Sequence, residues 1–279
     1  MEQTKRTYAL SADDNIWFLC DLTHHSAQYS SLFDHPYLAM YKRLHETYGT
    51  AVRLNLFAEN DERYTERYGT FALENMTERY RDEFRANAHW LRFAFHSKTE
   101  FPARPYEFST GEDIAEDCRR VHNEVRRFAG EECLETATTI HFGTANLAGT
   151  KALYAEGVRV LMGFTESSSA TDVRYYLTDE QVQEVKKYGV WKDAETDMAF
   201  GVIACVLNCQ SADASQKILE NFRQKYPYCR HLELMIHEQY FCEHYGAYLP
   251  DFEERVSAGC CWCTENGYAP VFSGDVLGK

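Results

Sequence analysis

Titratable side chains follow four apolar segments of the sequence that have strand character, at the point where each segment ends. Asp13 and Asp14 come after "TYALSA", His96 after "WLRFAF", His141 after "TATTI" and His237 after "LELMI". A single histidine in such a place is more often a hydrogen-bonded structural residue, but a buried core has no need of the whole set. Carboxylates and imidazoles bind divalent cations and transfer protons near neutral pH. The set therefore predicts a catalytic or metal-binding site.

The segment "FHSKTEFPARPY" holds two of these ligand types close together, because His96 and Glu100 are four residues apart. Pro102 and Pro105 prevent a long helix here, so the segment forms a shaped loop or a single helical turn. In either form both side chains can point at one place. Together with Asp14 they would supply one imidazole and two carboxylates, a ligand set that suits a divalent cation.

Asp13 and Asp14 are neighbours, and adjacent residues of an extended strand point to opposite faces. The two carboxylates can share a site only if the chain turns there. We expect such a turn and a division of labour, because only one of two adjacent carboxylates can face a bound cation squarely. Hydrolysis of an amide or ester requires a polarised carbonyl, an activated water and a proton for the leaving group. A cation, a carboxylate and a histidine meet these requirements.

Strand-like and helix-like segments alternate along the chain, and these elements must position the site. Strand character is found in "TYALSA", "AVRLNLF", "WLRFAF", "TATTIH", "VRVLMGF", "MAFGVIACVL", "HLELMIH" and "APVFSG". Amphipathic helices are expected at residues 36–48, 74–88, 111–128, 149–156, 178–188, 213–225 and 250–266.

This alternation predicts parallel strands joined by crossover helices in one α/β, barrel-like domain over residues 1–279. In such a barrel, catalytic groups lie at the C-terminal ends of the strands, where the titratable residues are found. An open, doubly wound sheet is the alternative. However, no glycine-rich phosphate loop of the GxGxxG or GxxxxGKS type follows any of the strands.

The charge of the chain narrows the class of partner. The 279 residues carry a formal charge of −14 without a basic stripe, which argues against nucleic acid and against an anionic membrane surface. A neutral or cationic substrate is easier to accommodate. No apolar run approaches the length of a membrane span, and "MEQTKRTYALSADD" passes directly into strand pattern without a signal peptide. We therefore expect a cytoplasmic protein, and a homo-oligomer is compatible with the sequence.

Ten cysteines are expected to be reduced thiols that serve mainly in packing. Cys260 and Cys263 form a CxxC pair, but a structural zinc site needs a second such pair. Cys205 and Cys209 are too widely spaced and lie in a strand-like run. Burial is thus the favoured interpretation of this cluster, with metal or redox use as the alternative.

The order of these motifs resembles that of the NodB-homology polysaccharide deacetylases, carbohydrate esterase family four. The resemblance rests on "SADD" near the first strand, "HSKTEFP" after the third, a histidine after the late strand "LELMIH", and the strand and helix count. It would cover roughly residues 7–275. It implies a distorted (β/α)7-8 barrel of the glycoside hydrolase and deacetylase type, and metal-dependent removal of acetyl groups from N-acetylated sugars.

The resemblance also implies roles for individual residues. Asp13 would be the catalytic base, Asp14 and His96 metal ligands, and His237 the general acid. Glu100 stands where the family has the second histidine of its HSxxH loop, and it would be the third ligand. Zinc is the expected metal, and the oxygen-rich ligand set would also accept manganese, iron or magnesium.

Other residues are candidates for lining the site. The family's Arg-Pro motif is absent, and "TTIHFGTAN" with His141 stands in its place. His24 and His25 lie in the segment after the first acidic pair, close enough to join the mouth of the barrel. Tyr240 belongs to the aromatic segment "HEQYFCEHYGAYLPDF", which would form either a sugar-stacking wall or the cover of an apolar core.

Two functions from different classes follow. The first is a metal-dependent hydrolase of C–N bonds that deacetylates an N-acetylated sugar or a small related amide, with a small-molecule or oligosaccharide substrate. The second is a carbohydrate-binding or regulatory barrel that has lost catalysis, since the Arg-Pro motif is missing. A glycosidase is a third and weaker alternative, because two carboxylates in a barrel mouth would also suit that chemistry.

Overall fold

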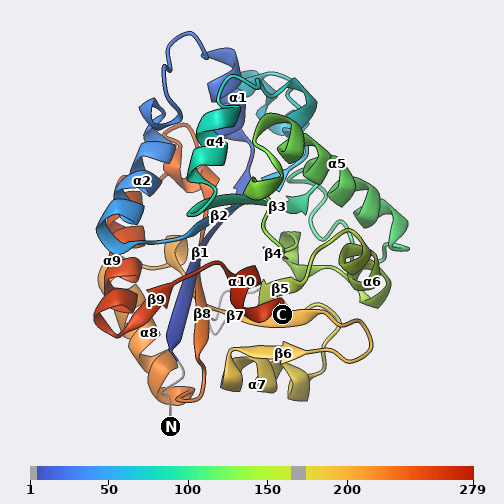
Figure 1. Ribbon diagram of the computed structural model, residues 1–279, viewed down its shortest axis with the longest axis vertical. Coiled ribbons are helices and arrows are strands. Elements are labelled where there is room, and N and C mark those ends of the chain that lie inside the picture. The colour runs from blue at the N-terminus through green and yellow to red at the C-terminus, as the bar shows by residue number, and fades with distance from the viewer. Residues whose placement is uncertain (1–4, 165–173) are drawn as a thin grey trace.

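Parallel strands form a nearly closed, distorted barrel with helices around it (Figure 1). The computed structural model describes residues 5–164 and 174–279. Along the barrel wall the strand order is β3-β2-β1-β8-β7-β5-β4. The bounds of these strands are β1 (Arg6–Asn15), β2 (Val52–Phe57), β3 (Leu91–Ser97), β4 (Ala137–Thr138), β5 (Val160–Gly163), β7 (Ala199–Val206) and β8 (His231–His237). Two short strands extend this wall: β6 (Val190–Lys192) pairs antiparallel with β7, and β9 (Tyr268–Pro270) pairs parallel with β1.

The two ends of this strand order approach each other at β3 and β4. A parallel bridge joins Phe93 to Leu134, and the backbone N–H of Glu135 donates to the carbonyl of Phe93 at 2.8 Å. This seam brings the ends of β3 and β4 beside each other, although His96 and His141 are far apart in the sequence. The α/β barrel predicted from the alternation of elements is therefore confirmed.

Helices cover the outside of the barrel, with α2, α8 and α9 on one side and α5 and α6 on the opposite side in Figure 1. Helix α2 occupies the predicted residues because Pro36 suits its first turn and Gly49, with a φ of 71°, ends it in a left-handed conformation. The helix bounds are α1 (Trp17–His24), α2 (Pro36–Tyr48), α3 (Thr65–Tyr68), α4 (Arg81–Asn87), α5 (Glu112–Phe128), α6 (Leu147–Ala155), α7 (Asp179–Tyr188), α8 (Ala212–Lys225), α9 (Phe252–Glu265) and α10 (Ser273–Leu277).

Some predicted elements are shorter than expected. The helix predicted at residues 74–88 begins only at Arg81, because Met76 is outside the helical region and the Thr77 hydroxyl accepts the N–H of Arg79 instead. The strand predicted for "TATTIH" is limited to β4. Beyond Thr138, side chains rather than a neighbouring strand take over backbone hydrogen bonding, as when His96 contacts the carbonyl of Thr139. The strand predicted at "APVFSG" ends at Pro270, and α10 follows.

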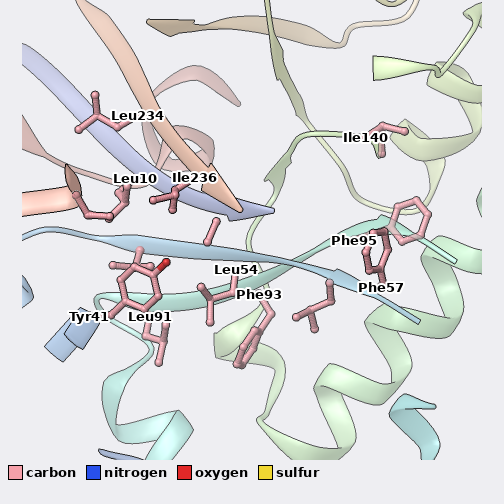
Figure 2. Packing of buried hydrophobic residues seen from close by; sticks show 14 of the residues in the cluster. Leu10, Tyr41, Leu54, Phe57, Leu91, Phe93, Phe95, Ile140, Leu234 and Ile236 are labelled. Carbon is pink, nitrogen blue, oxygen red and sulfur yellow. The ribbon is translucent and has the colours of Figure 1, made fainter. Parts of the chain in front are cut away.

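Apolar side chains pack on both faces of the barrel strands. All residues of β2 and of β7 are buried, which explains the continuous apolar sequence of β7, whereas β2 also buries Arg53 and Asn55. Figure 2 shows Leu10 of β1, Leu234 and Ile236 of β8, Leu54 of β2 and Phe93 of β3, which belong to one buried apolar cluster. All ten cysteines are free thiols, and Cys260 and Cys263 belong to the buried core. Within the described ranges, no helix combines the length and apolarity that crossing a bilayer requires.

Candidate metal centre and active site

A cavity of about 320 Å³ lies where the parallel strands end. Its polar lining comes from four of the predicted strand ends: Asp13 and Asp14 from β1, His96 from β3, His141 from the turn after β4, and His237 from β8. These five residues, far apart in the sequence, thus face one space. The rest of the lining consists of Glu100, Thr139, Phe142, Gly143, Val206, Asn208, Cys209, Met235, Gln239, Tyr240 and Tyr245.

A local turn of the chain allows both neighbouring aspartates to line this cavity. Asp14 has a φ of 64°, in the left-handed region, and the register between β1 and β2 shifts between Ala12 and Asn15. Such a bulge changes the direction of one side chain relative to regular strand alternation. The expected turn at the acidic pair is therefore present, but it interrupts β1 rather than following it, because β1 continues to Asn15.

Three potential metal ligands converge at the inner end of the cavity. The Oδ1 atom of Asp14 lies 3.0 Å from Nε2 of His96 and 3.4 Å from Nδ1 of His141. The two imidazole nitrogens are themselves 3.0 Å apart. All three side chains are buried, and their ligand atoms lie within 4.8 Å of one another. Among the residues that the structure describes, these three form the group that could hold a metal ion.

The outer nitrogens of both imidazoles are engaged by backbone carbonyls. Nδ1 of His96 bonds to the carbonyl of Thr139, and Nε2 of His141 bonds to the carbonyl of Glu100 at 3.0 Å. A carbonyl oxygen can only accept, so these nitrogens are the donors, and in a neutral imidazole the inner nitrogen then carries a lone pair. Such outer hydrogen bonds are the usual means of orienting metal-binding histidines.

The carboxylate of Asp14 completes this arrangement of acceptors. Its buried Oδ1 atom has no hydrogen-bond partner. Burial acts to raise the pKa of Asp14, but His141, His237 and His96 together hold it well below its usual range, so the group is ionised. When both imidazoles are neutral and donate through their outer nitrogens, three electron-pair donors face one another and the charge of the buried carboxylate is uncompensated. A bound cation would compensate it, so these residues fit a metal ion.

Glu100 lies at the same cavity, but its carboxylate is outside this group. The carboxylate accepts a hydrogen bond from Nε2 of Gln239 at 2.9 Å. Burial, together with the negative charge of Asp14, raises the pKa of Glu100 to about 8. The contact of Glu100 with the candidate centre runs through its backbone carbonyl, which orients His141. Its role as a third ligand stays a prediction.

Asp13 and His237 face the cavity from neighbouring strands. They are directly paired in the register of β1 and β8. Oδ1 of Asp13 accepts a 2.6 Å hydrogen bond from the side-chain amide of Asn55. Nδ1 of His237 bonds to Oδ1 of Asn208 at 2.8 Å, and Nε2 lies 4.0 Å from Oδ2 of Asp14. Because the amide oxygen accepts, Nδ1 carries the proton and Nε2 is the atom available to a ligand.

The remaining sequence candidates are divided between the cavity and the exposed surface. Tyr240 lines the cavity, with its ring centroid 6.0 Å from that of His237 and 5.3 Å from that of Tyr245. His24 and His25, at the end of α1, are not among the residues that line it. His25 instead contacts Asp21, with Nδ1 2.7 Å from Oδ1.

Several lining residues were not predicted from the sequence. Asn208 lies two residues after the end of β7, so a search for polar residues just beyond the strands would have found it. Gln239 and Tyr245 lie in the aromatic segment after β8, where nothing in the local pattern separates lining residues from packing residues. Glu238, beside them, is buried and accepts hydrogen bonds from the backbone N–H groups of Ile16, Trp17 and Phe18. This contact fixes the start of α1 just after the acidic pair.

No protein-family model and no curated protein sequence matches this chain. Its fold, however, is found in solved structures. A 4-alpha-glucanotransferase from Thermococcus litoralis matches over 98% of this chain at 12% sequence identity and a TM-score of 0.59. This chain covers 40% of the length of that protein.

Two further structures match over nearly the whole of both chains. A protein from Mycobacterium smegmatis assigned as a polysaccharide deacetylase matches over 99% of this chain and 90% of its own, at 11% identity and a TM-score of 0.52. A polysaccharide deacetylase from Bacillus cereus matches over 98% and 94%, at 9% identity and a TM-score of 0.43. At such identities the likeness concerns the fold. The resemblance to polysaccharide deacetylases is confirmed at that level.

Proposed function

We propose that this chain is a metal-dependent hydrolase of C–N bonds that deacetylates a neutral N-acetylated sugar or a small related amide. The observation that carries the proposal is the convergence of Asp14, His96 and His141, with a buried carboxylate oxygen that has no hydrogen-bond partner. A carboxylate and a second histidine, Asp13 and His237, lie beside this group in the same cavity. The deacetylase-like fold is consistent with this chemistry.

Asp14, His96 and His141 would hold the cation through one carboxylate oxygen and two imidazole nitrogens. This donor set is typical of zinc, and it also accepts manganese or iron, whereas magnesium prefers oxygen ligands. A divalent cation in this place supplies positive charge that polarises the amide carbonyl and makes a water molecule easier to deprotonate.

The proton transfers are assigned to Asp13 and His237. Asp13 accepts a proton from the water molecule as its oxygen attacks the amide carbon. His237 carries a proton on Nε2, and it donates this Nε2 proton to the amide nitrogen of the substrate as the C–N bond breaks. Acetic acid, which ionises in solution after release, and a free amine are the products, and both residues return to their starting forms when the proton passes from Asp13 to His237 through water. Asn208 holds the tautomer of His237 that this transfer requires.

The lining of the cavity indicates the class of substrate. Its size, about 320 Å³, is at the lower end of the range for small-molecule sites. Tyr240 and Tyr245 provide aromatic surface of the kind that packs against sugar rings. The described residues that line the cavity include no lysine or arginine, so an anionic substituent would lose its hydration without gaining an ion pair. A neutral substrate is therefore favoured.

A carbohydrate-binding barrel without catalysis is the second candidate, and it would use the same tyrosine wall. A glycosidase is less favoured by the geometry. Such an enzyme needs a carboxylate that is available to the sugar, whereas Oδ1 of Asp14 faces two imidazole nitrogens.

Metal analysis combined with hydrolysis assays tests the proposal. Purified protein is assayed for bound zinc, manganese and iron, and for amine release from a panel of N-acetylated mono- and disaccharides. Near-stoichiometric metal and amine release that a chelator abolishes would support it. Sugar binding without amine release would favour the binding protein, and protein that takes up none of these metals would exclude the hydrolase.

A further inference from the structure

A chain of buried polar contacts leads from Asp13 into the interior of the barrel. The amide of Asn55 donates to Oδ1 of Asp13 at 2.6 Å, and Oδ1 of Asn55 accepts from Nε of Arg53 at 2.8 Å. The guanidinium of Arg53 in turn holds both oxygens of Glu233, at 2.6 and 3.0 Å. Every member of this chain is buried.

The strand geometry explains why these residues meet. Arg53 and Asn55 are two residues apart on β2, so both side chains point to the same face of that strand. Ser11 and Asp13 are related in the same way on β1, and Ser11 is paired with Arg53 in the register. The contacts therefore run along the inside of the barrel, from an inner layer around Arg53 to the layer at the cavity.

Arg53 determines which way the amide of Asn55 faces. The guanidinium has only donors, so it can bond only to the amide oxygen of Asn55. The NH2 group of Asn55 must then face Asp13. A reversed amide would place its oxygen against the Asp13 carboxylate and its NH2 group against a cation, which is unfavourable at both ends.

A buried arginine and glutamate are seldom retained for stability alone, because apolar residues of similar volume often serve as well. Here the ion pair is fully hydrogen-bonded, since Glu233 also accepts from Ser11 and from Ser273, both at 2.9 Å. A rigid and saturated inner layer is a suitable support for a side chain whose position matters.

We propose that Asn55 is a positioning residue for Asp13, oriented by the Arg53–Glu233 ion pair. Its hydrogen bond holds one carboxylate oxygen of Asp13, which leaves the other oxygen to face the cavity in a fixed direction. This inference rests on the proposed function, in which Asp13 takes a proton from water. A misplaced base costs rate rather than substrate affinity, because the reacting atoms must be aligned within a fraction of an ångström.

Two variants of Asn55 test the proposal. Asn55→Ala removes the hydrogen bond to Asp13. Asn55→Asp keeps the size of the side chain and its contact with Arg53, but it replaces the amide donor with a carboxylate oxygen that repels Asp13, so circular dichroism and thermal unfolding verify the fold of both variants before assay. In both variants kcat is expected to fall about 30- to 100-fold, with KM changed less than about threefold. Zinc content should equal that of the wild type, since no metal ligand is altered.

Ser273→Ala is the matched control. Ser273 is also buried and also contacts Glu233, but it lies on the side of the ion pair away from Asn55. The Ser273→Ala variant should lower thermal stability about as much as Asn55→Ala does, and it should leave kcat unchanged. An equal loss of kcat in Ser273→Ala and Asn55→Ala would overturn the proposal, because the effect would then belong to the inner layer as a whole.

A crystal structure of Asn55→Ala provides a measurement that does not depend on turnover. The Asp13 carboxylate is expected to rotate or to occupy two rotamers. An unmoved Asp13, together with kcat within threefold of wild type in both Asn55 variants, would overturn the assignment of Asn55. If the wild type itself releases no amine, the proposed function fails, and the position of Asp13 in the variant still decides whether Asn55 holds it.

Discussion

Nε2 of His96 lies 3.0 Å from Nδ1 of His141, and each ring bonds through its other nitrogen to a backbone carbonyl. With the outer nitrogens as donors, a neutral ring at either position presents a lone pair from its inner nitrogen, and Oδ1 of Asp14 faces both inner nitrogens. Two lone pairs at this distance repel unless a cation or a proton lies between them. The following predictions build on this relationship and on the cavity beside it.

Removal of the His141 imidazole should weaken zinc binding by more than about 100-fold, because a ligand is lost rather than an outer contact. In contrast, Glu100→Gln should bind zinc as the wild type does, since that carboxylate lies outside the group of ligands. If Glu100 is the third ligand instead, Glu100→Gln should weaken zinc binding more than His141→Ala does. Calorimetric zinc titration of His141→Ala and Glu100→Gln, started from metal-free protein, distinguishes the two.

Substitution of the neighbouring aspartates should separate their roles. Asp13→Asn is expected to retain zinc but to lose at least about 100-fold in kcat, because an amide cannot accept the proton from water. Asp14→Asn should lose both zinc and activity, because an amide oxygen carries no charge to balance the cation. Metal content and kcat are measured on the same preparations. Wild-type turnover in Asp13→Asn would show that another group is the base.

The cavity should discriminate against anionic substrates. An N-acetylated amino sugar is expected to be hydrolysed with a kcat/KM about tenfold or more above that of its phosphate ester, because no lysine or arginine is among the described residues that line the cavity. Cys209 lines the cavity and is exposed, so Cys209→Lys should narrow this ratio. Cys209→Gln, of similar length and neutral, should leave the ratio unchanged. Equal rates on both substrates in the wild type would contradict the prediction.

Stability should decrease on the acid side partly through His122, a buried residue of α5. Burial, with a smaller effect of Arg126, lowers the pKa of His122 from 6.5 to about 4. Between these values the unfolded chain binds the proton more readily, so the free energy of unfolding falls as the pH falls from 6.5 to about 4. The share of His122 in this loss is about 2 kcal/mol at pH 5.

Denaturant unfolding of metal-free protein at pH 7.5 and pH 5 measures this contribution. His122→Leu should lose less stability between the two pH values than the wild type does, by about the same 2 kcal/mol. His89, which is exposed, offers the control: His89→Gln should show the wild-type pH dependence. The same pH dependence in all three proteins would show that His122 makes no such contribution.

Much of the fold follows from local sequence. The alternation of apolar strands with amphipathic helices was sufficient for a parallel α/β barrel, and the strand predicted at "HLELMIH" is β8. Helix α2 has the predicted bounds because its limits are set by Pro36 and Gly49, within the segment itself. The short antiparallel strand β6 was not predicted, because its pairing with β7 depends on a hairpin partner and not on its own three residues.

The candidate site, like the fold, could be predicted from the sequence only in part. Placing titratable residues at strand ends was enough to nominate Asp13, Asp14, His96, His141 and His237, because in a parallel barrel all strands end at one mouth. The sequence could not show that His141, rather than the Glu100 carboxylate, lies within ligand distance of Asp14. That choice depends on the seam between β3 and β4, which joins segments with no local relationship.

The hydrogen-bonded group of residues that contacts Asp13 from the barrel interior was also decided by tertiary structure alone. Arg53, Asn55 and Glu233 occur in the middle of apolar strands, where a polar residue carries no sign of its partner. They become one hydrogen-bonded unit only when β2, β1 and β8 lie side by side. Likewise, the directions of Asp13 and Asp14 depend on the positive φ of Asp14. Local patterns determine which elements form, whereas long-range strand pairing and one bulge determine which side chains meet.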